Sequence, residues 1–573
     1  MNIIESRMCR PWKHEYRSLF LLGGLIGIVC FLCVYGIRIL DFTYDAWLMN
    51  GDIDLRQHYL GWCHFRNSDW HMPIGLIDSL SYPISVSVIW TDSIPLFAVF
   101  FKLFRGILPV TFQYFGLFGL VSFALQGGVS TLLVRKLTER RYLCLLMAPF
   151  FILSFTVLQR MYYHTALSAQ WIILLALLIW LYHIGAGSTM KKCGIWAVMG
   201  LLCVSIHSYF VPMVGLIMLG SLTDDIFKCR ERKRAVVRAI LTTVSYCVAV
   251  LSILLLLGAF YENASPVGEG IGTFGSNLNT FINPLEHSAL FSGLPLYYDF
   301  QYEGFGYLGA GMLLLGIGAG ILLVFTWIKK RVHISKVFFC RHSSKLILLA
   351  ITLIFIMLAV LPMVTIGSVK LFGIPYPAFL QNIMNIFRSN GRFIWTPMYI
   401  IMLGILAIYM RCIPKTSESQ KEQSRRSVVL TVILAVGLLL QLIDVSKMIW
   451  EKQNYFMKSE QSYESLWEEI DTEKDLEEYK HFVFMYLEND WIMDTAYYAY
   501  YHDMTLNHYY YARSYDTQIE KEIVRYRDEI AKGMIREDVI YIFREQDLQE
   551  MSVPNELQLT EFDDHIIGTK YGL

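Results

Sequence analysis

The sequence predicts an α-helical polytopic membrane protein of about eleven transmembrane helices, followed by a small extracytoplasmic α/β domain. Three observations predict this class. The 573-residue chain is 55% hydrophobic and only 17% charged, whereas soluble domains carry roughly 25% charged residues. Several apolar runs reach the ~20 residues that cross a bilayer. After residue 445 the composition turns polar. We therefore expect a membrane domain over 1–445 and an α/β domain over 446–573.

The apolar runs set the positions of the predicted spans. One further apolar segment, 92–108, is short and contains Lys102 and Arg105. We interpret it as a helix that lies in the outer interface or re-enters the membrane, with a short true span as the alternative. The eleven spans themselves are predicted at 18–40, 110–134, 142–158, 166–184, 194–210, 211–227, 237–260, 307–328, 346–367, 393–410 and 428–443.

The distribution of lysine and arginine predicts the orientation of these spans, because basic loops stay in the cytoplasm. With eleven spans all the basic clusters fall on one side, so we expect a plasma-membrane protein with a cytoplasmic N-terminus. The polar tail and the segments 41–109, 160–164, 261–306 and 368–392 then lie outside. The basic clusters are at 7–17, 135–141, 191–192, 228–238, 329–345 and 411–426.

The polar tail alternates between two periodicities, which is typical of a mixed α/β domain. Runs rich in aromatic and β-branched residues predict strands at 481–487, 505–512 and 538–544. Helical patterns lie at 491–501 and 517–532. We expect this domain to rest on the outer membrane surface.

The first outer loop concentrates polar and aromatic residues in an otherwise apolar chain. Asp52 and Asp54 follow the first span by about a dozen residues. A carboxylate there can act as a general base on an acceptor, or hold a divalent cation; the alternative is a solvated loop carboxylate. Gln57, His58 and Trp62 follow closely and suit a sugar ligand, although tryptophans at this depth are also typical of an interfacial aromatic belt.

Other histidines and acids of this loop carry weaker signals. His58, His64 and His71 are six and seven residues apart, not the four of a helical zinc pair, so we do not predict zinc. Asp92 precedes Ser-Ile-Pro, a pattern typical of a helix N-cap. A cap at the mouth of a cavity also lines that cavity, so Asp92 remains a substrate-binding candidate.

Two later outer loops carry charged residues beside spans. Glu303 lies in FQYEGFGYLG, and Arg388 and Arg392 lie in IFRSNGRFIW. Arginines on the outer side depart from the usual bias of basic residues toward the cytoplasm. They would bind anionic headgroups, or would hold the phosphate of a lipid-linked substrate with their forked guanidinium groups.

The sequence lacks the signature motifs of several enzyme and transporter classes. The sequence contains no P-loop, so ATP-driven transport is not expected, and no GxSxG, kinase or HExxH signature. The basic clusters mark topology, and we expect no nucleic-acid partner. The membrane itself is the predicted partner.

Five short runs carry a resemblance to a known group of enzymes. They are GDIDLRQHYLGWCHFR, WTDSIPL, FQYFG, YEGFGYLG and FRSNGRFIW. With the predicted architecture, they resemble the GT-C superfamily of membrane glycosyltransferases, and more closely an uncharacterised bacterial family of polytopic glycosyltransferases. The resemblance covers the chain to about Asp444 and extends more loosely into the tail.

The resemblance implies transfer of a sugar from a polyprenyl-phosphate-linked donor to a cell-envelope glycan acceptor. It implies Asp54, and second Asp52, as the catalytic acid, and it leaves open a divalent cation, Mg²⁺ or Mn²⁺. Gln57, His58, Trp62, Asp92, Glu303, Arg388 and Arg392 would contact the substrates. The chain departs from the superfamily in lacking an HPP or KPP sequence and an evident second metal-binding acid. A flippase for lipid-linked saccharides and a non-catalytic assembly partner remain as alternatives.

Overall fold

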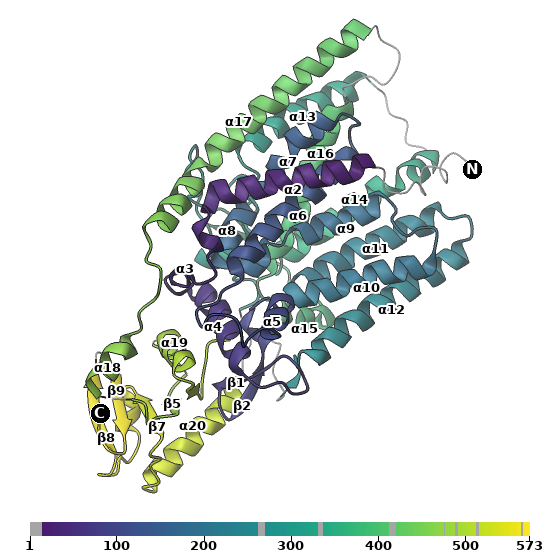
Figure 1. Ribbon diagram of the computed structural model, residues 1–573. Helices are drawn as coiled ribbons and strands as arrows, with labels where there is room; N and C mark the ends of the chain where they lie inside the picture. The colour runs from purple at the N-terminus through teal and green to yellow at the C-terminus, as the bar shows by residue number, and fades with distance from the viewer. Residues whose placement is uncertain are drawn as a thin grey trace. The chain divides into compact units, whose positions relative to one another are not determined.

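The protein is described by a computed structural model that covers most of the chain (Figure 1). It divides into two units. Among the described residues, the helical unit comprises 14–40, 115–250 and 270–458, and the mixed unit comprises 41–114, 251–261 and 459–573. Parts of the basic clusters at 7–17, 329–345 and 411–426, and of the loop at 261–306, lie outside the described residues. Those residues are 14–261, 270–329, 336–411, 420–474, 476–487, 491–511, 515–562 and 565–573.

The helical unit confirms the predicted class. Eight helices of the described chain are long and apolar enough to cross a membrane, or nine if one bent pair is a single span. That pair, α7 (Arg141–Ile152) and α8 (Phe155–Tyr163), bends by 45° at its break. The eight helices are α2 (His14–Tyr35), α6 (Phe115–Arg135), α10 (Thr189–Ile206), α11 (Phe210–Lys228), α12 (Arg232–Leu256), α14 (Lys336–Val360), α16 (Trp395–Arg411) and α17 (Gln420–Lys458). Helix α13 (Ala310–Lys329), at the span predicted for 307–328, contributes a shorter apolar stretch, Ala310–Phe325.

One predicted span, at 166–184, is shorter than expected. The chain forms a 3₁₀ turn at Thr165–Ser168 and then α9 (Trp171–Leu181), which has 11 residues. At 1.5 Å per residue this helix is only ~16 Å long. We predicted this span from the length of its apolar run, and that length does not distinguish one straight helix from two short pieces.

Small residues explain why α2 and α6 pack closely. A Cβ on Gly23 would collide with the side chain of Thr131, and a Cβ on Gly27 would collide with the backbone of Phe123. A small residue every fourth position lets two helix backbones approach, as in membrane helix pairs generally. Gly127 faces the Gly23 backbone from the other side.

One predicted span ends earlier than expected, and one helix crosses the expected domain boundary. The span expected at 346–367 ends at Val360, and residues beyond it form a hairpin of β3 (Met363–Ile366) and β4 (Val369–Gly373). The β-branched run in this stretch favours a strand over further helix. Helix α17 continues across 445/446 to Lys458, and Met448 and Phe456 are buried in this last part of the helix.

The mixed unit contains most of the first loop and the C-terminal domain. The loop supplies α3 (Ala46–Met49), α4 (Ile53–Asn67), the hairpin of β1 (Leu76–Ser81) and β2 (Ile84–Ser87), and α5 (Pro95–Lys102). At eight residues α5 is ~12 Å long, too short to span a bilayer. The interpretation of 92–108 as non-spanning is therefore confirmed. The β1–β2 hairpin was not predicted.

The C-terminal domain is a five-stranded mixed sheet, which confirms the predicted α/β class. Its strand order is β6-β5-β7-β9-β8; β5 pairs parallel with β6 and β7, and β9 pairs antiparallel with β7 and β8. The predicted strand at 505–512 is reduced to two residues. The strands are β5 (His481–Phe484), β6 (Thr505–Leu506), β7 (Val539–Phe543), β8 (Gln558–Phe562) and β9 (His565–Thr569); the helices are α18 (Leu466–Lys474), α19 (Ile492–Tyr501), α20 (Asp516–Ala531) and α21 (Glu545–Gln549).

The first loop and the C-terminal domain share one core within the mixed unit. The His64 ring lies 2.9 Å from the Ala496 carbonyl oxygen, and the Tyr500 hydroxyl donates to the Val110 carbonyl at 2.8 Å. The Tyr82 backbone N–H donates to the Leu506 carbonyl at 2.7 Å. These bonds join α4 to α19 and the β1–β2 hairpin to β6. The two segments must therefore lie on the same side of the membrane.

Candidate functional site

Helix α4 carries the predicted catalytic acids at its N-terminus. Asp52 is the exposed N-cap residue, and its carboxylate accepts from the Ile53 backbone N–H at 2.7 Å. Asp54 is half-buried in the first turn. Carboxylates at a helix N-terminus are stabilised by the free N–H groups and by the helix dipole. Asp52 is therefore used as a cap, while the helix holds Asp54 at a fixed place in its first turn.

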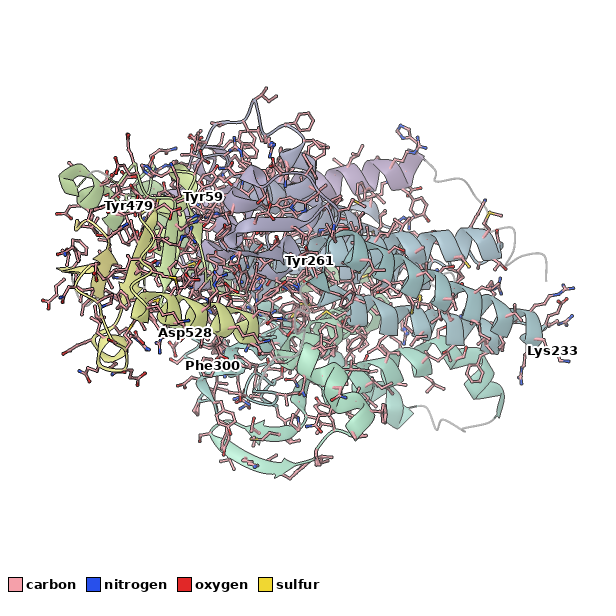
Figure 2. All side chains as sticks on the ribbon, turned by 90° about the horizontal axis from the view of Figure 1, so that it is seen from below. Tyr59, Lys233, Tyr261, Phe300, Tyr479 and Asp528 are labelled. Atoms are coloured by element: carbon pink, nitrogen blue, oxygen red, sulfur yellow. The ribbon has the colours of Figure 1, made fainter. Side chains whose placement is uncertain are left out.

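Two of the predicted substrate contacts serve packing in the structure. Trp62 is completely buried, and its indole N–H donates to the Phe112 carbonyl at 2.9 Å. Tyr59, labelled in Figure 2, is buried on the same helix. The Gln57 amide donates to the carbonyls of Trp90 and Tyr510, at 3.2 and 3.3 Å. Gln57 thus joins α4 to the C-terminal domain, and Trp62 has no exposed face for a sugar ring.

His58 and Asp92 come together within the mixed unit. His58 follows Asp54 by four residues, so both side chains lie on one face of α4. The His58 ring is fully buried, and a ring nitrogen lies within 4.8 Å of an Asp92 carboxylate oxygen. Imidazole and carboxylate are both ligands that Mn²⁺ accepts. Asp54 and His58 thus share one face of α4, and Asp92 lies beside His58.

A strained turn presents Asp92. Asp92 and Ile94 have φ values of 52° and 53°, in the left-handed region that a β-branched residue rarely adopts. The Ser93 hydroxyl between them donates to the His58 carbonyl at 2.7 Å. A Cβ on Gly61 would collide with Thr91 and Ser93, so only glycine allows the turn to approach α4 this closely.

The expected N-cap role of Asp92 is wrong. Helix α5 begins at Pro95 with Ile94 as its N-cap residue, and Asp92 ends the preceding 3₁₀ turn. The proline at N1 matches the sequence pattern, but the left-handed turn displaces the cap by two residues. Such strain persists where surrounding packing enforces it, and it is concentrated at functional sites.

The helical unit holds a buried cluster of two arginines and one glutamate. Arg160 reaches both carboxylate oxygens of Glu303, at 2.9 and 3.3 Å, and Arg392 Nε donates to Glu303 Oε2 at 2.6 Å. All three side chains are at most 8% exposed. Burial alone would raise the pKa of Glu303, but Arg160 and Arg392 outweigh it and hold that pKa well below its usual range. The cluster therefore carries a net charge of +1.

Glycines explain why Glu303 and Arg392 meet although they lie 89 residues apart. Each is adjacent in sequence to a glycine, Gly304 and Gly391, and a Cβ on Gly391 would collide with the Gly304 backbone. The Ser276 hydroxyl lies 3.0 and 3.1 Å from the two glycine carbonyls and bridges the two segments. The close backbone approach brings the two charged side chains together.

Aromatic and imidazole rings line this cluster. The Arg392 guanidinium lies over the Tyr209 ring at 4.6 Å, a cation–π contact. Burial, together with the positive charges of Arg392 and Arg160, holds the pKa of His164 well below its usual range. The His164 and His207 rings are 5.0 Å apart. His164 is therefore neutral at physiological pH. Arg388, the other predicted arginine, is half-buried, and its guanidinium lies 5.3 Å from the Phe274 ring centre.

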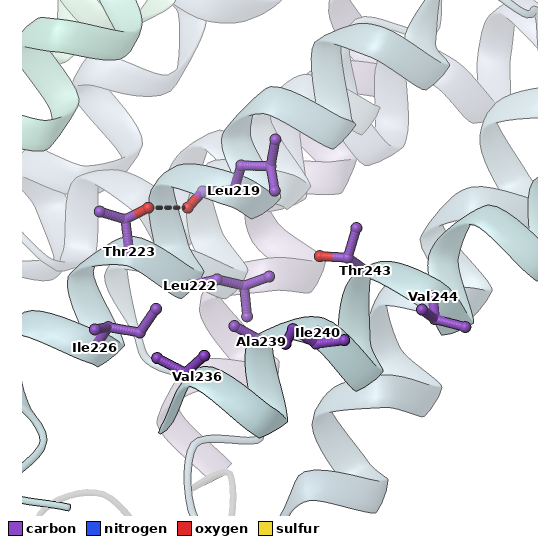
Figure 3. Close-up of a pocket in the computed structure, with 9 residues that line it drawn as sticks. All are labelled: Leu219, Leu222, Thr223, Ile226, Val236, Ala239, Ile240, Thr243 and Val244. Carbon is purple, nitrogen blue, oxygen red and sulfur yellow. Dashed lines mark hydrogen bonds between the residues drawn. The ribbon is translucent and has the colours of Figure 1, made fainter. Parts of the chain in front are cut away.

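A surface recess between α11 and α12 has a different character (Figure 3). Its lining is almost entirely aliphatic, and the Thr223 hydroxyl is occupied by the Leu219 carbonyl at 2.8 Å. None of the nine described residues that line it is titratable. The recess suits hydrocarbon, and we place no chemistry there.

Two features of the sites were not predicted from the sequence. Arg160 was expected in a short loop, but it lies in α8. An arginine directly beside an apolar run is unusual, and this could have marked Arg160 as a functional residue. Asp45 is fully buried in the mixed unit, where it accepts from the Tyr497 hydroxyl at 2.9 Å. Burial raises the pKa of Asp45. No local motif marked this residue.

The fold thus defines a polytopic helical membrane protein with a C-terminal mixed α/β domain. The chain belongs to the family described as "Domain of unknown function (DUF6311)", which matches residues 24–446; residues 467–570 match the "DUF6311 C-terminal domain".

Solved structures provide distant likenesses. The chain is similar to the Archaeoglobus fulgidus oligosaccharyltransferase tethered with an acceptor peptide containing the NVT sequon, with a TM-score of 0.42, 10% identity, and coverage of 93% of this chain and 70% of that chain. The apo form of that enzyme gives a TM-score of 0.42 and 11% identity, with the same coverage of 93% and 70%. Likenesses of this size do not define an activity. No curated protein matches the chain.

Proposed function

We propose that this protein is a membrane glycosyltransferase that transfers a sugar from a polyprenyl-phosphate-linked donor to an extracytoplasmic cell-envelope acceptor. The observation that carries the proposal is the arrangement at the start of α4. Asp54 and His58 share one helix face, and the strained turn holds Asp92 within 4.8 Å of His58. The motifs that resemble GT-C enzymes, GDIDLRQHYLGW and WTDSIPL, contain these three residues.

The proposed reaction is a single displacement at the anomeric carbon. Asp54 accepts the proton of the acceptor hydroxyl, and the acceptor oxygen forms a bond to the anomeric carbon. The bond from that carbon to the donor phosphate breaks, and polyprenyl phosphate leaves with the electron pair. One displacement inverts the configuration of the sugar.

A divalent cation is compatible with the residues present. His58 and Asp92 would supply an imidazole and a carboxylate ligand, a set that suits Mn²⁺ better than Mg²⁺ because Mg²⁺ prefers oxygen ligands. When bound, such an ion stabilises the negative charge that develops on a leaving phosphate. Without it, His58 and Asp92 still fix the polar edge of the site.

The arginines of the helical unit support recognition of the donor phosphate. Arg392 is already paired with Glu303, so the cluster offers its net charge of +1 and not a free guanidinium. Arg388 stacks on Phe274 and is the more accessible of the two. We assign phosphate contact first to Arg388. The ion pairs of Glu303 favour a positioning role over sugar contact.

The test compares lipid extracts and surface glycans from cells that carry the wild-type gene, Asp54→Asn or Asp69→Asn. Asp69 is the matched control because it lies in the same loop and its side chain is 89% exposed. We expect Asp54→Asn to accumulate lipid-linked sugar and to lose one sugar from a surface polymer, while Asp69→Asn matches the wild type.

Other outcomes would contradict the proposal. Unchanged lipid pools with intact glycans in Asp54→Asn would favour an assembly partner without catalysis. Donor retained in the inner leaflet would favour a flippase. Expression level and membrane insertion of each variant are measured in parallel, so that loss of the protein is not mistaken for loss of transfer.

A further inference from the structure

The helical unit carries an exposed apolar surface between α14 and α16. All five residues of β4 are exposed, including Val369, Leu371 and Phe372. Helix α15 (Ala378–Ile386) adds Phe379, which is 77% exposed, and Ile383. We call these five side chains the hairpin face. Several large apolar side chains exposed within one short segment favour an interaction surface.

The hairpin face is held rigidly. Asn277 bonds both backbone groups of Gly367 at the hairpin turn, at 2.8 and 2.9 Å. The Gln301 amide donates to the Thr365 hydroxyl at 2.9 Å, and the Leu278 N–H donates to the Thr365 carbonyl at 2.9 Å. These bonds join β3 to the neighbouring loop. That loop exposes further apolar side chains of its own, among them Ile282 and Phe300. Phe300 is labelled in Figure 2.

The charged residues of the segment that forms this surface are all of one sign. The sequence has no aspartate or glutamate between Glu303 and Glu418. Within 361–390 its only charged residues are Lys370 and Arg388, and Lys370 is exposed on β4 beside the apolar side chains. Such a combination of apolar and basic side chains complements an anionic lipid headgroup above an acyl region.

The surface also continues the lipid-facing side of a span. Leu349, Leu353 and Met357 are exposed and four residues apart, so they form one stripe along α14. The helix ends at Val360, and β3 begins three residues later at Met363. The apolar stripe thus leads directly to the hairpin.

We propose that the hairpin face lies in the phospholipid interface of the membrane that the spans cross, with Lys370 at an anionic headgroup. The β3–β4 hairpin and α15 then fix the depth of the neighbouring loop that carries Glu303. This role does not depend on glycosyl transfer.

The test places a photoreactive benzoylphenylalanine at Phe372, at Phe379 or at Tyr571 of the full-length protein. Tyr571 is the control because it is 66% exposed in the C-terminal domain. Each variant is reconstituted in nanodiscs of phosphatidylethanolamine and phosphatidylglycerol, irradiated and analysed by mass spectrometry. We expect a higher yield of lipid adducts at 372 and at 379 than at 571. With Lys370→Glu, the share of phosphatidylglycerol in the 372 adducts should fall.

Three results would overturn the proposal. Adducts at 372 and 379 with a second copy of the chain would make this surface a self-association interface. Adducts with another protein in native membranes, in place of lipid, would make it a docking site. A lipid yield at 372 and 379 no higher than at 571 would refute the placement of the hairpin face in the interface. All three replaced side chains are exposed, so the substitutions leave the core intact.

Discussion

Replacement of Glu303 by glutamine tests whether the buried charge cluster is assembled as the structure shows. The glutamine side chain would keep the size of the glutamate and one acceptor oxygen, but it would remove the negative charge. Arg160 and Arg392 would then remain as two buried guanidinium groups without a carboxylate between them. The amide nitrogen of the new side chain would also face a donor where the wild type has an acceptor.

The expected cost follows from the burial of the cluster. Breaking a buried ion pair by removing one partner destabilises a protein by about 3–5 kcal/mol, because the remaining charge is left uncompensated. Glu303 satisfies two arginines at 2.6–3.3 Å, so we place E303Q at the upper part of that range. Asp299→Asn is the matched control: Asp299 lies in the same 3₁₀ helix but is exposed, and its substitution should cost at most ~0.5 kcal/mol.

The assay is thermal unfolding of the purified full-length protein in nanodiscs, followed by near-UV circular dichroism. We expect E303Q to melt several degrees below both the wild type and D299N. Because the folded pKa of Glu303 is lowered, its stabilisation is present above the unfolded pKa of ~4.3 and is lost only as the pH falls toward the folded value. The difference between E303Q and the wild type should therefore be constant from roughly pH 6 to 8. A melting temperature for E303Q equal to that of D299N would refute the reasoning.

Three further predictions concern the mixed unit. Gly61→Ala should push the turn at Thr91 and Ser93 away from α4 and destabilise by about 1–3 kcal/mol, whereas Gly106→Ala, which meets no neighbouring atom, should be neutral in the same melting assay. Trp62→Ala should destabilise by about 3–5 kcal/mol, since Trp62 is a core residue; a stable variant with weakened substrate binding would instead support sugar stacking. Because burial raises the pKa of Asp45, its carboxyl favours folding below the unfolded pKa and loses that contribution as pH rises; limited proteolysis of the C-terminal domain should therefore show a smaller pH dependence in Asp45→Asn.

Much of the fold follows from local sequence pattern. The apolar runs predict the helical spans, and the short length of 92–108 with its two basic residues predicts that this segment does not cross the membrane. Strands β5 and β7 and helices α19 and α20 of the C-terminal domain match their predicted positions to within one to three residues. These elements have strong periodicity, and periodicity is a local property that one sequence shows directly.

The parts that were missed depend on contacts between distant residues. Arg160 meets Glu303 across 143 residues, and His64 of the first loop meets Ala496 across 432. No local pattern encodes such a partner. The short strands β1, β2, β8 and β9 were also missed, because strand formation depends on the neighbouring strand as much as on intrinsic preference. These distant contacts also bring the first loop and the C-terminal domain into one unit, which no local sequence pattern predicts.

The two charged sites differ in what they can do with a proton. A carboxylate whose pKa lies far below its usual range is a weak base, so Glu303 in its pair with Arg160 and Arg392 is unsuited to remove a proton from an acceptor. The cluster keeps a net positive charge, which suits an anion. At α4, by contrast, Asp54 and His58 share one helix face, and Asp92 lies beside His58. We therefore propose that Asp54 accepts the proton and that Arg388 contacts the donor phosphate. An Asp54 variant should therefore reduce the rate of transfer at saturating donor, while an Arg388 variant should raise the donor concentration needed to reach that rate.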